Sequence, residues 1–320
     1  MCCCNEYISG RGASGLGVLM KVSDYLTREA VAYFTARSDW QAWRLVLGTW
    51  LFIAVIFATV AAWPNPLTIV VAVILLAGRQ LALSVLMHDC GHRTLFRSAR
   101  LNDIVGQWLC ALPVMNDQPS YARGHLEHHR KAGSHDDPDL ANYQAYPVPW
   151  ESFRRKMIRD LTGQTGFKLL SYIVRGASGV ISNEKRESAL PFLQQLLVQL
   201  VLFLILAACG IAWTFLLWVV AYMTVFMFII RVRQIAEHAA VPDLFDPDAR
   251  RNTRTVDAPW WQRAVFAPCG VNFHLEHHFM ASVPCYKLKA LRQHLRRRHA
   301  LDQVPEFRGY GQLLRHVVIA

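Results

Sequence analysis

Histidine is the residue type whose placement in this chain most strongly indicates chemistry. Eight of the 13 histidines fall in three windows of five residues each. The windows are His88-Asp-Cys-Gly-His92, His125-Leu-Glu-His128-His129 and His274-Leu-Glu-His277-His278. Random placement of 13 histidines along 320 residues would leave these windows almost empty, so composition alone does not explain the clustering.

The spacing inside each window suits metal binding if the window is helical. At 3.6 residues per turn, residues four apart lie about 40° apart around a helix, so His88 and His92 share one face. In the pattern H-x-x-H-H, the three rings fall within an arc of about 100° by the same geometry. We therefore expect each window to direct its imidazoles toward one point. Neutral imidazole is a good ligand for iron, zinc or copper.

The number of histidines bears on the kind of site. One helix-borne pair is more often a surface or packing feature, but three clusters together favour metal binding. Eight ligands exceed the four that zinc usually takes, so two metal ions are the simplest interpretation. The chain contains neither H-E-x-x-H nor E-x-x-H, which argues against a metalloprotease of that type and a carboxylate di-iron bundle. An all-histidine pair of sites suggests iron, while ligand type alone leaves zinc and copper open.

The elements that must position these histidines are predicted to be membrane helices. One apolar block, 45–87, contains a single charged residue, Arg79, and is broken by Pro64-Asn65-Pro66. A second block, 189–230, contains no charged residue and is interrupted by Cys209-Gly210. A span needs about 20 apolar residues, so each block holds two. The predicted spans are Leu45–Trp63, Pro66–Met87, Ala189–Ala208 and Ile211–Ile230.

These spans predict an all-α integral membrane fold, with four transmembrane helices in two hairpins and a cytoplasmic histidine-rich cap. The composition agrees, with 53% hydrophobic and 18% charged residues. The formal charge is +11, and every Lys and Arg except Arg79 lies outside the spans, on one side of the bilayer. The positive-inside rule makes that side cytoplasmic, with both termini. The basic charge therefore has a membrane explanation, and we expect no nucleic acid partner.

Several other features carry weaker expectations. Arg79 and Gln80 should face a protein or water-filled interior, because an ionisable group in lipid is costly. A glutamine stripe on the third span should make contacts between helices. The segment Asp103–Met115 is too short to span and should lie at the membrane interface. The glutamines are Gln194, Gln195 and Gln199.

The cysteines and the N-terminal residues add little to the functional prediction. The eight cysteines form no C-x-x-C pair, so neither a disulfide framework nor a cysteine zinc site is expected. We assign no role to Cys2-Cys3-Cys4. Residues 1–40 are mixed and polar and do not read as a signal peptide.

The three histidine windows, placed after paired apolar spans, resemble the histidine boxes of the membrane fatty acid desaturase and hydroxylase family. The resemblance covers Leu45 to Leu291, and the context of the third window, Val271–Pro284, is similar to that family's. It implies two non-haem irons, O₂ activation and removal of hydrogen from an unactivated C–H bond. It divides the chain into an N-terminal cytoplasmic segment (1–44), a desaturase-like membrane domain (45–291) and a basic C-terminal cytoplasmic segment (292–320).

The resemblance also assigns residues. His238 matches an additional histidine between the second and third boxes, while Gln234 stands where some relatives have an iron-associated Asn, which leaves its role open. The implied iron ligands are His88, His92, His125, His128, His129, His238, His274, His277 and His278.

Other residues near the boxes are assigned no ligand role. The acidic residues of the boxes could orient ligands as hydrogen-bond acceptors, or be solvated or ion-paired. We expect His135 to be a loop residue and the later histidines to lie on the surface. The acids are Asp89, Glu127 and Glu276, and the later histidines are His294, His299 and His316.

Together these features predict a membrane-bound di-iron oxygenase that uses O₂ and external electrons to desaturate a long-chain acyl lipid. A hydroxylase or ketolase acting on an acyl, sphingolipid or carotenoid substrate remains an alternative. A membrane zinc hydrolase or a non-enzymatic metal-binding receptor is an alternative of another class.

No nucleotide-binding glycine motif, iron–sulfur cysteine spacing or fused haem domain is visible in the sequence, so an external ferredoxin or cytochrome is expected to supply the electrons. Arg292 and the run 296–298 could dock an acidic donor, or equally attract anionic lipid.

Overall fold

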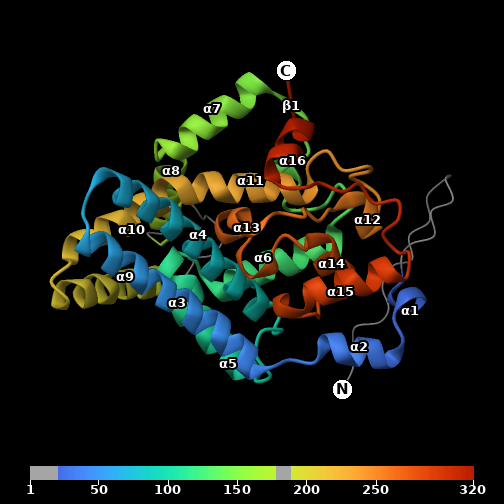
Figure 1. Ribbon diagram of the computed structural model, residues 1–320, viewed down its shortest axis with the longest axis horizontal. Helices are drawn as coiled ribbons and strands as arrows, with labels where there is room; N and C mark the ends of the chain where they lie inside the picture. The colour runs from blue at the N-terminus through green and yellow to red at the C-terminus, as the bar shows by residue number, and fades with distance from the viewer. Residues whose placement is uncertain (1–20, 178–188) are drawn as a thin grey trace.

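The computed structural model describes residues 21–177 and 189–320, so Cys2, Cys3 and Cys4 lie outside the described residues. The described chain is predominantly helical (Figure 1). Its one sheet is a parallel pair of two-residue strands, β1 (Val148–Pro149) with β2 (Val318–Ile319), which departs slightly from the all-α prediction. Helices or their ends therefore position the nine candidate histidine ligands described below.

The first predicted hairpin is formed by α3 (Asp39–Ala62) and α4 (Pro66–Gly91). The turn between them begins α4 with strong local signals. The side chain of Asn65 accepts hydrogen bonds from two backbone N–H groups of the first turn, and Pro66 occupies the first helical position. Helix α4 continues past the predicted end at Met87, so His88 lies in its last turn and His92 caps it.

The second hairpin pairs α9 (Leu190–Ala208) with a nearly continuous helical run. The run consists of η4 (Ala212–Thr214), α10 (Phe215–Ala221), the π-helical η5 (Tyr222–Phe226) and α11 (Met227–His238).

The helix that contains this last predicted span continues past Ile230 to His238. Buried Val232 and Ile235 extend the apolar face beyond the predicted span. The guanidinium of Arg231 is paired with Asp160, with Nη2 and Oδ1 2.8 Å apart, so the charge does not end the helix. His238 thus occupies the last turn of a helix that begins among the membrane spans.

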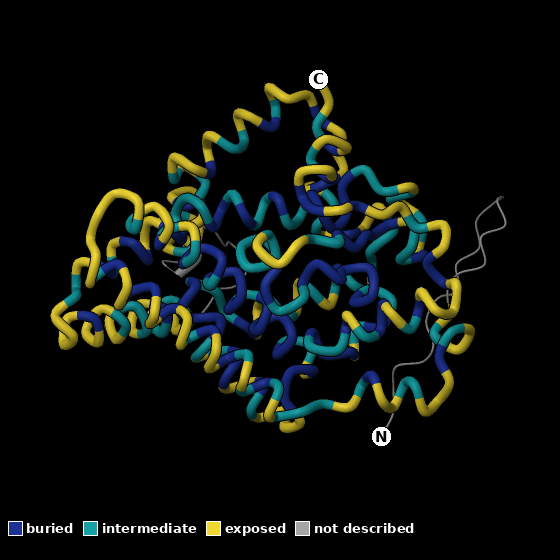
Figure 2. The backbone as a smooth tube through the Cα atoms, viewed as in Figure 1, coloured by how far each residue is buried: buried dark blue, intermediate teal, exposed yellow. Residues whose placement is uncertain are grey.

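Four helical segments of the described chain are long and apolar enough to cross a membrane, which identifies the protein as a membrane protein. Figure 2 shows many exposed positions along the backbone of α3 and α9. Large apolar side chains are among the exposed residues of these helices, such as Leu51, Leu193 and Leu197. Such faces suit lipid. The segments are Arg28–Ala62, Pro66–Gly91, Leu190–Ala208 and Ala212–His238.

The remaining elements form the cap and the connections. Before the second hairpin lie α1 (Val22–Tyr25), α2 (Arg28–Thr35), α5 (Ala99–Val105), η1 (Gly106–Ala111), η2 (Leu112–Val114), α6 (Gln118–Lys131), η3 (Leu140–Asn142), α7 (Trp150–Leu161) and α8 (Gln164–Ala177). After it lie α12 (Ala249–Asn252), α13 (Trp260–Phe266), η6 (Pro268–Gly270), α14 (His274–Phe279), α15 (Cys285–Arg297) and α16 (Tyr310–Val317). Figure 1 shows α6, α14 and α15 gathered beyond the ends of α4 and α11.

The polar residues inside the second span face protein, as expected. Arg79 donates a hydrogen bond to the backbone carbonyl of Ala264, and its guanidinium lies over the ring of Phe52. Gln80 is buried and donates to the carbonyl of Trp218 at 2.9 Å. Gly78 permits the close approach of α13, because a Cβ there would lie 3.0 Å from the Ala264 carbonyl oxygen.

The glutamine stripe on α9 makes the predicted contacts between elements. Gln199 donates to the carbonyl of Pro113 at 2.9 Å, and Gln194 accepts from Gln107 at 3.4 Å. Both partners belong to the α5–η1–η2 segment, so the stripe ties α9 to it.

The segment Asp103–Met115 is more deeply packed than expected for a helix lying at the interface. Cys110, Ala111 and Leu112 are fully buried. The reason is a close approach at Gly106, where a Cβ would lie 2.5 Å from the Cβ of Cys90 on α4. The segment is therefore part of the core beside the first histidine window.

The two-hairpin topology predicts that the α9–η4 turn and the C-terminus lie on opposite sides of the membrane. Cys209 is an exposed free thiol in that turn. In a variant with Cys2, Cys3 and Cys4 replaced by serine, a membrane-impermeant maleimide should label Cys209 in intact cells. A cysteine substituted for Ala320 should react only after permeabilisation. Cys209→Ser is the control for the first signal, and labelling of both sites without permeabilisation would contradict the topology.

Candidate metal centre

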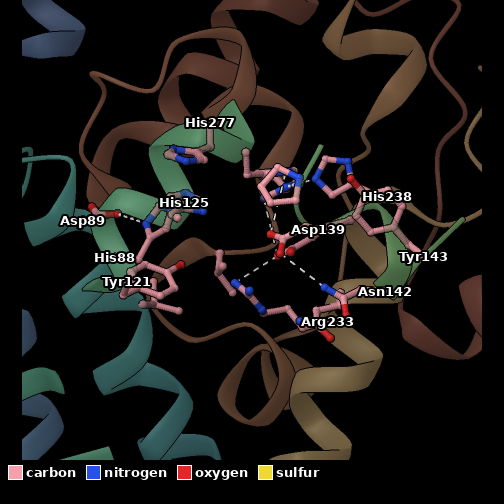
Figure 3. A pocket seen from close by; sticks show the side chains of 18 of the residues that line it. His88, Asp89, Tyr121, His125, Asp139, Asn142, Tyr143, Arg233, His238 and His277 are labelled. Atoms are coloured by element: carbon pink, nitrogen blue, oxygen red, sulfur yellow. Dashed lines mark hydrogen bonds and ion pairs between the residues drawn. The ribbon is translucent and has the colours of Figure 1, made fainter. Parts of the chain in front are cut away.

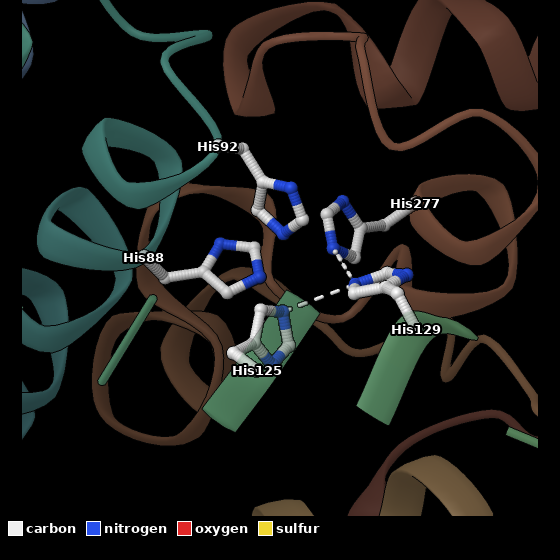
Figure 4. Close-up of side chains that lie close together, drawn as sticks. All are labelled: His88, His92, His125, His129 and His277. Carbon is white, nitrogen blue, oxygen red and sulfur yellow. Dashed lines mark hydrogen bonds between the residues drawn. The ribbon is translucent and has the colours of Figure 1, made fainter. Parts of the chain in front are cut away.

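The nine candidate histidines converge from three helices, α6, α11 and α14, and from the end of α4 into two groups. In each group, one nitrogen of every ring lies within 4.8 Å of those of the others. Figure 4 shows the larger group, whose rings face a common centre. The five-histidine cluster consists of His88, His92, His125, His129 and His277, and the four-histidine cluster consists of His128, His238, His274 and His278.

The two H-x-x-H-H windows are divided between the clusters. On α6, His125 and His129 join the five-histidine cluster, while His128 joins the other. On α14 the assignment is reversed, because His277 alone joins the five-histidine cluster. Residues i and i+4 diverge by about 40°, whereas i+3 and i+4 diverge by about 100°, so one short helix can serve two centres. The expectation that each window aims all its rings at one point is wrong for these two windows.

This division places the two clusters side by side. The rings of His129 and His278, one from each cluster, stack with centroids 4.3 Å apart. His277 and His278 are consecutive in sequence, with ring planes 89° apart. Two ions held by these clusters would therefore be close neighbours.

The distances between facing nitrogens fit ligands of a common ion. The Nε2 atom of His129 lies 3.0 Å from Nε2 of His125 and 2.9 Å from Nε2 of His277. In the other cluster, the Nε2 atoms of His238 and His274 are 2.8 Å apart. Two nitrogens bound at right angles to one ion at about 2.1 Å would lie about 3.0 Å apart. The donor set therefore fits a metal in each cluster.

Three of these rings are oriented by a hydrogen bond at Nδ1, which leaves Nε2 free to face the cluster centre. Nδ1 of His88 lies 3.1 Å from Oδ1 of Asp89, which matches the ligand-orienting alternative for that acid. Nδ1 of His238 lies 3.0 Å from the backbone carbonyl oxygen of Asn252. The third is His128, whose partner was not predicted.

Asp137 is that partner, with Oδ1 2.8 Å from Nδ1 of His128. The carboxylate also accepts from the hydroxyl of Tyr143 and from the backbone N–H of Asp139. Burial opposes its ionisation, but the hydrogen bonds from His128 and Tyr143 prevail and hold the pKa of Asp137 below its ordinary value. The available sequence signal was an acid-rich loop, His135-Asp-Asp-Pro-Asp139, directly after the second window.

Among the described residues, the two glutamates of the H-L-E-H-H windows form no hydrogen bond or ion pair with a candidate ligand. Glu127 is ion-paired with Arg130 and Lys131 on the outer face of α6, which matches the ion-paired alternative. Glu276 is fully buried and accepts hydrogen bonds from Thr255 and from Arg292, the latter at 2.7 Å. The same short sequence therefore has opposite environments, because α14 is covered by the cap and α6 has a solvated face.

Arg292 does not lie on the surface, contrary to the prediction that it could dock an acidic electron donor or attract anionic lipid. It is buried at 4% exposure and belongs to the interior of the cap. It forms its closest ion pair with Glu276. The basic surface must therefore be formed by other cations.

The histidines outside the clusters lie mostly where they were expected. His135 is exposed and stacks on Phe245 with centroids 4.0 Å apart. His299 and His316 are exposed. His294 is partly buried against Phe34, so the expectation of a surface position is wrong for this residue.

Burial favours the neutral form of most of the clustered imidazoles. Burial and the neighbouring His88 lower the pKa of His92 to about 3. The same causes, burial first and adjacent imidazoles second, hold the pKa of five further rings well below the ordinary value. Neutral rings retain the lone pair that binds a metal ion. The five are His125, His129, His274, His277 and His278.

A cavity of about 310 Å³ is lined by histidines of both clusters (Figure 3). It shares Tyr121, Arg233 and Gln234 with a groove of about 1030 Å³. That groove is lined by apolar residues of the membrane helices, including Leu81 and Phe226. The histidines of both clusters thus line one cavity that adjoins a groove among the membrane helices. Gln234, whose role the sequence left open, lines the cavity.

Comparison with known proteins gives an independent result. The family model described as fatty acid desaturase matches residues 64–310. A dihydrorhizobitoxine desaturase from Bradyrhizobium elkanii is 26% identical over 259 residues, covering 74% of this chain and 72% of the relative. An sn-1 oleoyl-lipid 12-desaturase from Arthrospira platensis is 24% identical over 230 residues, covering 64% and 62%. An sn-1 acyl-lipid omega-3 desaturase (ferredoxin) from Nostoc sp. (strain 36) is 29% identical over 93 residues, covering 29% and 24%.

Asp137→Asn should weaken metal binding in the four-histidine cluster, because the substitution removes the carboxylate that orients His128. Loss of such a partner typically lowers metal affinity about 10- to 100-fold. Metal analysis after a chelator challenge should show loss of one of the two ions. The matched control is Asp136→Asn, which changes an exposed neighbouring acid and should retain both. Equal losses in the two variants would contradict the orienting role of Asp137.

Proposed function

The chain belongs to the fatty acid desaturase family, and we propose that it is a membrane-bound di-iron oxygenase that desaturates a long acyl chain of a lipid. The observation that carries the proposal is the arrangement of two histidine clusters around one cavity, which meets a groove among the membrane helices. In the overall reaction, two hydrogens leave the acyl chain of the lipid. Two electrons come from a donor, and with two protons from solution O₂ becomes two waters.

The proposed iron ligands are the nine clustered histidines. Bound iron would supply O₂ activation for breaking an unactivated C–H bond. Nine imidazoles exceed the four ligands of an ordinary zinc site, which disfavours the zinc hydrolase. Around the ligands, Asp89, Asp137 and the Asn252 carbonyl orient three rings so that their Nε2 atoms face the centres.

The groove supports a long apolar substrate. Leu81, Phe226 and Ile230 line it beside the membrane spans, and Tyr121 and Gln234 lie where it joins the cavity. A chain held extended along this path would present a small number of carbons to both clusters. A desaturase requires its own residues to position the substrate in this way.

The names of the relatives point to more than one substrate, since one names dihydrorhizobitoxine and two name acyl lipids. The acyl assignment therefore depends on the groove. Hydroxylation begins with the same hydrogen removal and remains the alternative reaction.

Lipid profiling of cells with and without the protein tests the proposal. We expect an acyl lipid lighter by two hydrogens, formed only in the presence of O₂. His277→Ala should abolish the product, because this ring belongs to the five-histidine cluster, whereas His135→Ala should retain it. A product heavier by one oxygen atom would identify the hydroxylase instead. Unchanged acyl lipids with an oxidised carotenoid would refute the acyl substrate.

The electron donor is proposed to be an acidic, ferredoxin-type protein. The name of the Nostoc relative includes ferredoxin. On this chain, a surface pocket carries Arg263, Lys289, Arg296 and Arg308, together with two carboxylates that partly neutralise them. Its lining includes Phe273, the residue before His274. A donor attracted to these cations would lie close to the four-histidine cluster.

The double variant Lys289→Glu/Arg308→Glu should raise the KM for an acidic ferredoxin by about tenfold at low ionic strength. The effect should shrink as salt increases, because salt screens surface charges. The turnover rate at a saturating concentration of the electron donor should change little. The control is Arg154→Glu/Arg159→Glu on the exposed face of α7, which is basic but outside the pocket. The same increase in KM from the α7 variant would refute docking at the pocket.

A further inference from the structure

The cavity between the clusters contains an ion pair that metal binding does not explain. Arg233 and Glu237 lie one turn apart on α11, and both line the cavity. Nη1 of Arg233 is 3.3 Å from Oε1 of Glu237, and their side chains are 21% and 8% exposed. Figure 3 shows Arg233 on the same side of the cavity as Asn142.

Part of this pair's hydrogen-bonding capacity is unused. Among the residues that the structure describes, Nε of Arg233 has no hydrogen-bond partner, and Oε1 of Glu237 has only the 3.3 Å ion pair with Nη1 of Arg233; both atoms are buried. Buried polar atoms are normally satisfied, and leaving a charged group unsatisfied is costly. A methylene chain placed against them would leave both atoms unsatisfied. A ligand with a donor and an acceptor would instead pair with the exposed parts of the two side chains.

Further polar groups mark a path through the cavity. Gln234 and Ser120 lie where the cavity joins the groove. Asp139 and Asn142 line the cavity but not the groove; the Asp139 side chain is 50% exposed and Asn142 is exposed. An amphipathic molecule could thus keep its apolar tail in the groove and its polar end among these groups, beside the histidines.

A purely structural role does not account for this arrangement. Oε1 of Glu237 lies 3.6 Å from Nδ1 of His274, too far for a hydrogen bond but close enough to influence that ring. The contact with His274 gives a structural role to Glu237 but none to Arg233. Arg233 reaches no carboxylate other than Glu237 in the ion pairs of the described chain, and it lines both the cavity and the groove. Arg233 is therefore the residue to test.

We infer that the substrate carries hydroxyl or amide groups within a few bonds of the carbons that react, and that Arg233, Glu237 and Gln234 bind these groups. The inference rests on the proposed function and narrows its substrate class. The lipid reacts near its polar end rather than in the middle of an unbroken hydrocarbon chain. Arg233 is then a residue that determines specificity by contacting the substrate.

Equilibrium dialysis with two radiolabelled, short-chain probes tests the inference on the purified full-length protein. One probe is an N-acyl 2-amino-1,3-diol, which offers hydroxyl and amide groups beside its chain. The other is a fatty acid methyl ester of the same chain length, which offers only ester oxygens. Wild-type protein should bind the amide diol at least about tenfold more tightly, as expected for charge-assisted hydrogen bonds.

Arg233→Met should remove this preference by weakening only the amide diol. The matched control is Arg123→Met, the same substitution at an exposed position on the groove that is outside the cavity. It should keep the preference. Thermal unfolding and metal content check that both variants are folded. If Arg233→Met does not accumulate, Gln234→Leu should reduce the preference in the same assay.

Equal binding of both probes by the wild type, binding of neither, or an unchanged preference in Arg233→Met would overturn the inference. Product formation is scored separately. A preference for the amide diol without desaturation of any lipid would refute the proposed function and leave the binding site intact. Desaturation of simple acyl esters without any preference would refute the inference alone.

Discussion

The convergence of nine imidazoles in a buried space is the constraint on which the rest of the structure depends. Facing Nε2 atoms lie as close as 2.8 Å, and two imidazoles that both present lone pairs at that distance repel each other. One hydrogen bond can remove the repulsion between two rings, but it cannot do so for a group of four or five rings. A bound cation satisfies all of the lone pairs at once, so metal binding and the folding of the cap should be coupled.

Holding the rings in place requires ties between elements that are distant in sequence. Asp89 contacts His88 with one oxygen and accepts the backbone N–H of Cys285 with the other, at 2.7 Å, which joins α4 to the start of α15. Glu276 and Arg292 join α14 to α15 through a buried ion pair. Breaking such a pair would leave a buried charge unsatisfied. The cap is therefore braced on the same helices that supply the histidines.

The long helices connect this cap to the membrane. Helix α4 ends at the first histidine window, and α11 carries His238 in its last turn. Because both helices continue past the apolar stretch, the metal centre lies at the end of the groove between them and their neighbours. The groove thus leads from the membrane helices to the cavity that the histidines line.

The sequence by itself determined the histidine windows, the approximate spans and the resemblance to the desaturase family. These are local properties, set by residue identity and by the length of an apolar run. Only the tertiary structure decided how the rings are shared, because the direction of His128 or His277 depends on how its helix is rotated against distant elements. The same holds for the hydrogen bond from Asp137 and for the opposite environments of Glu127 and Glu276. Burial is set by what packs on a residue, and in this fold most of those partners come from far along the chain.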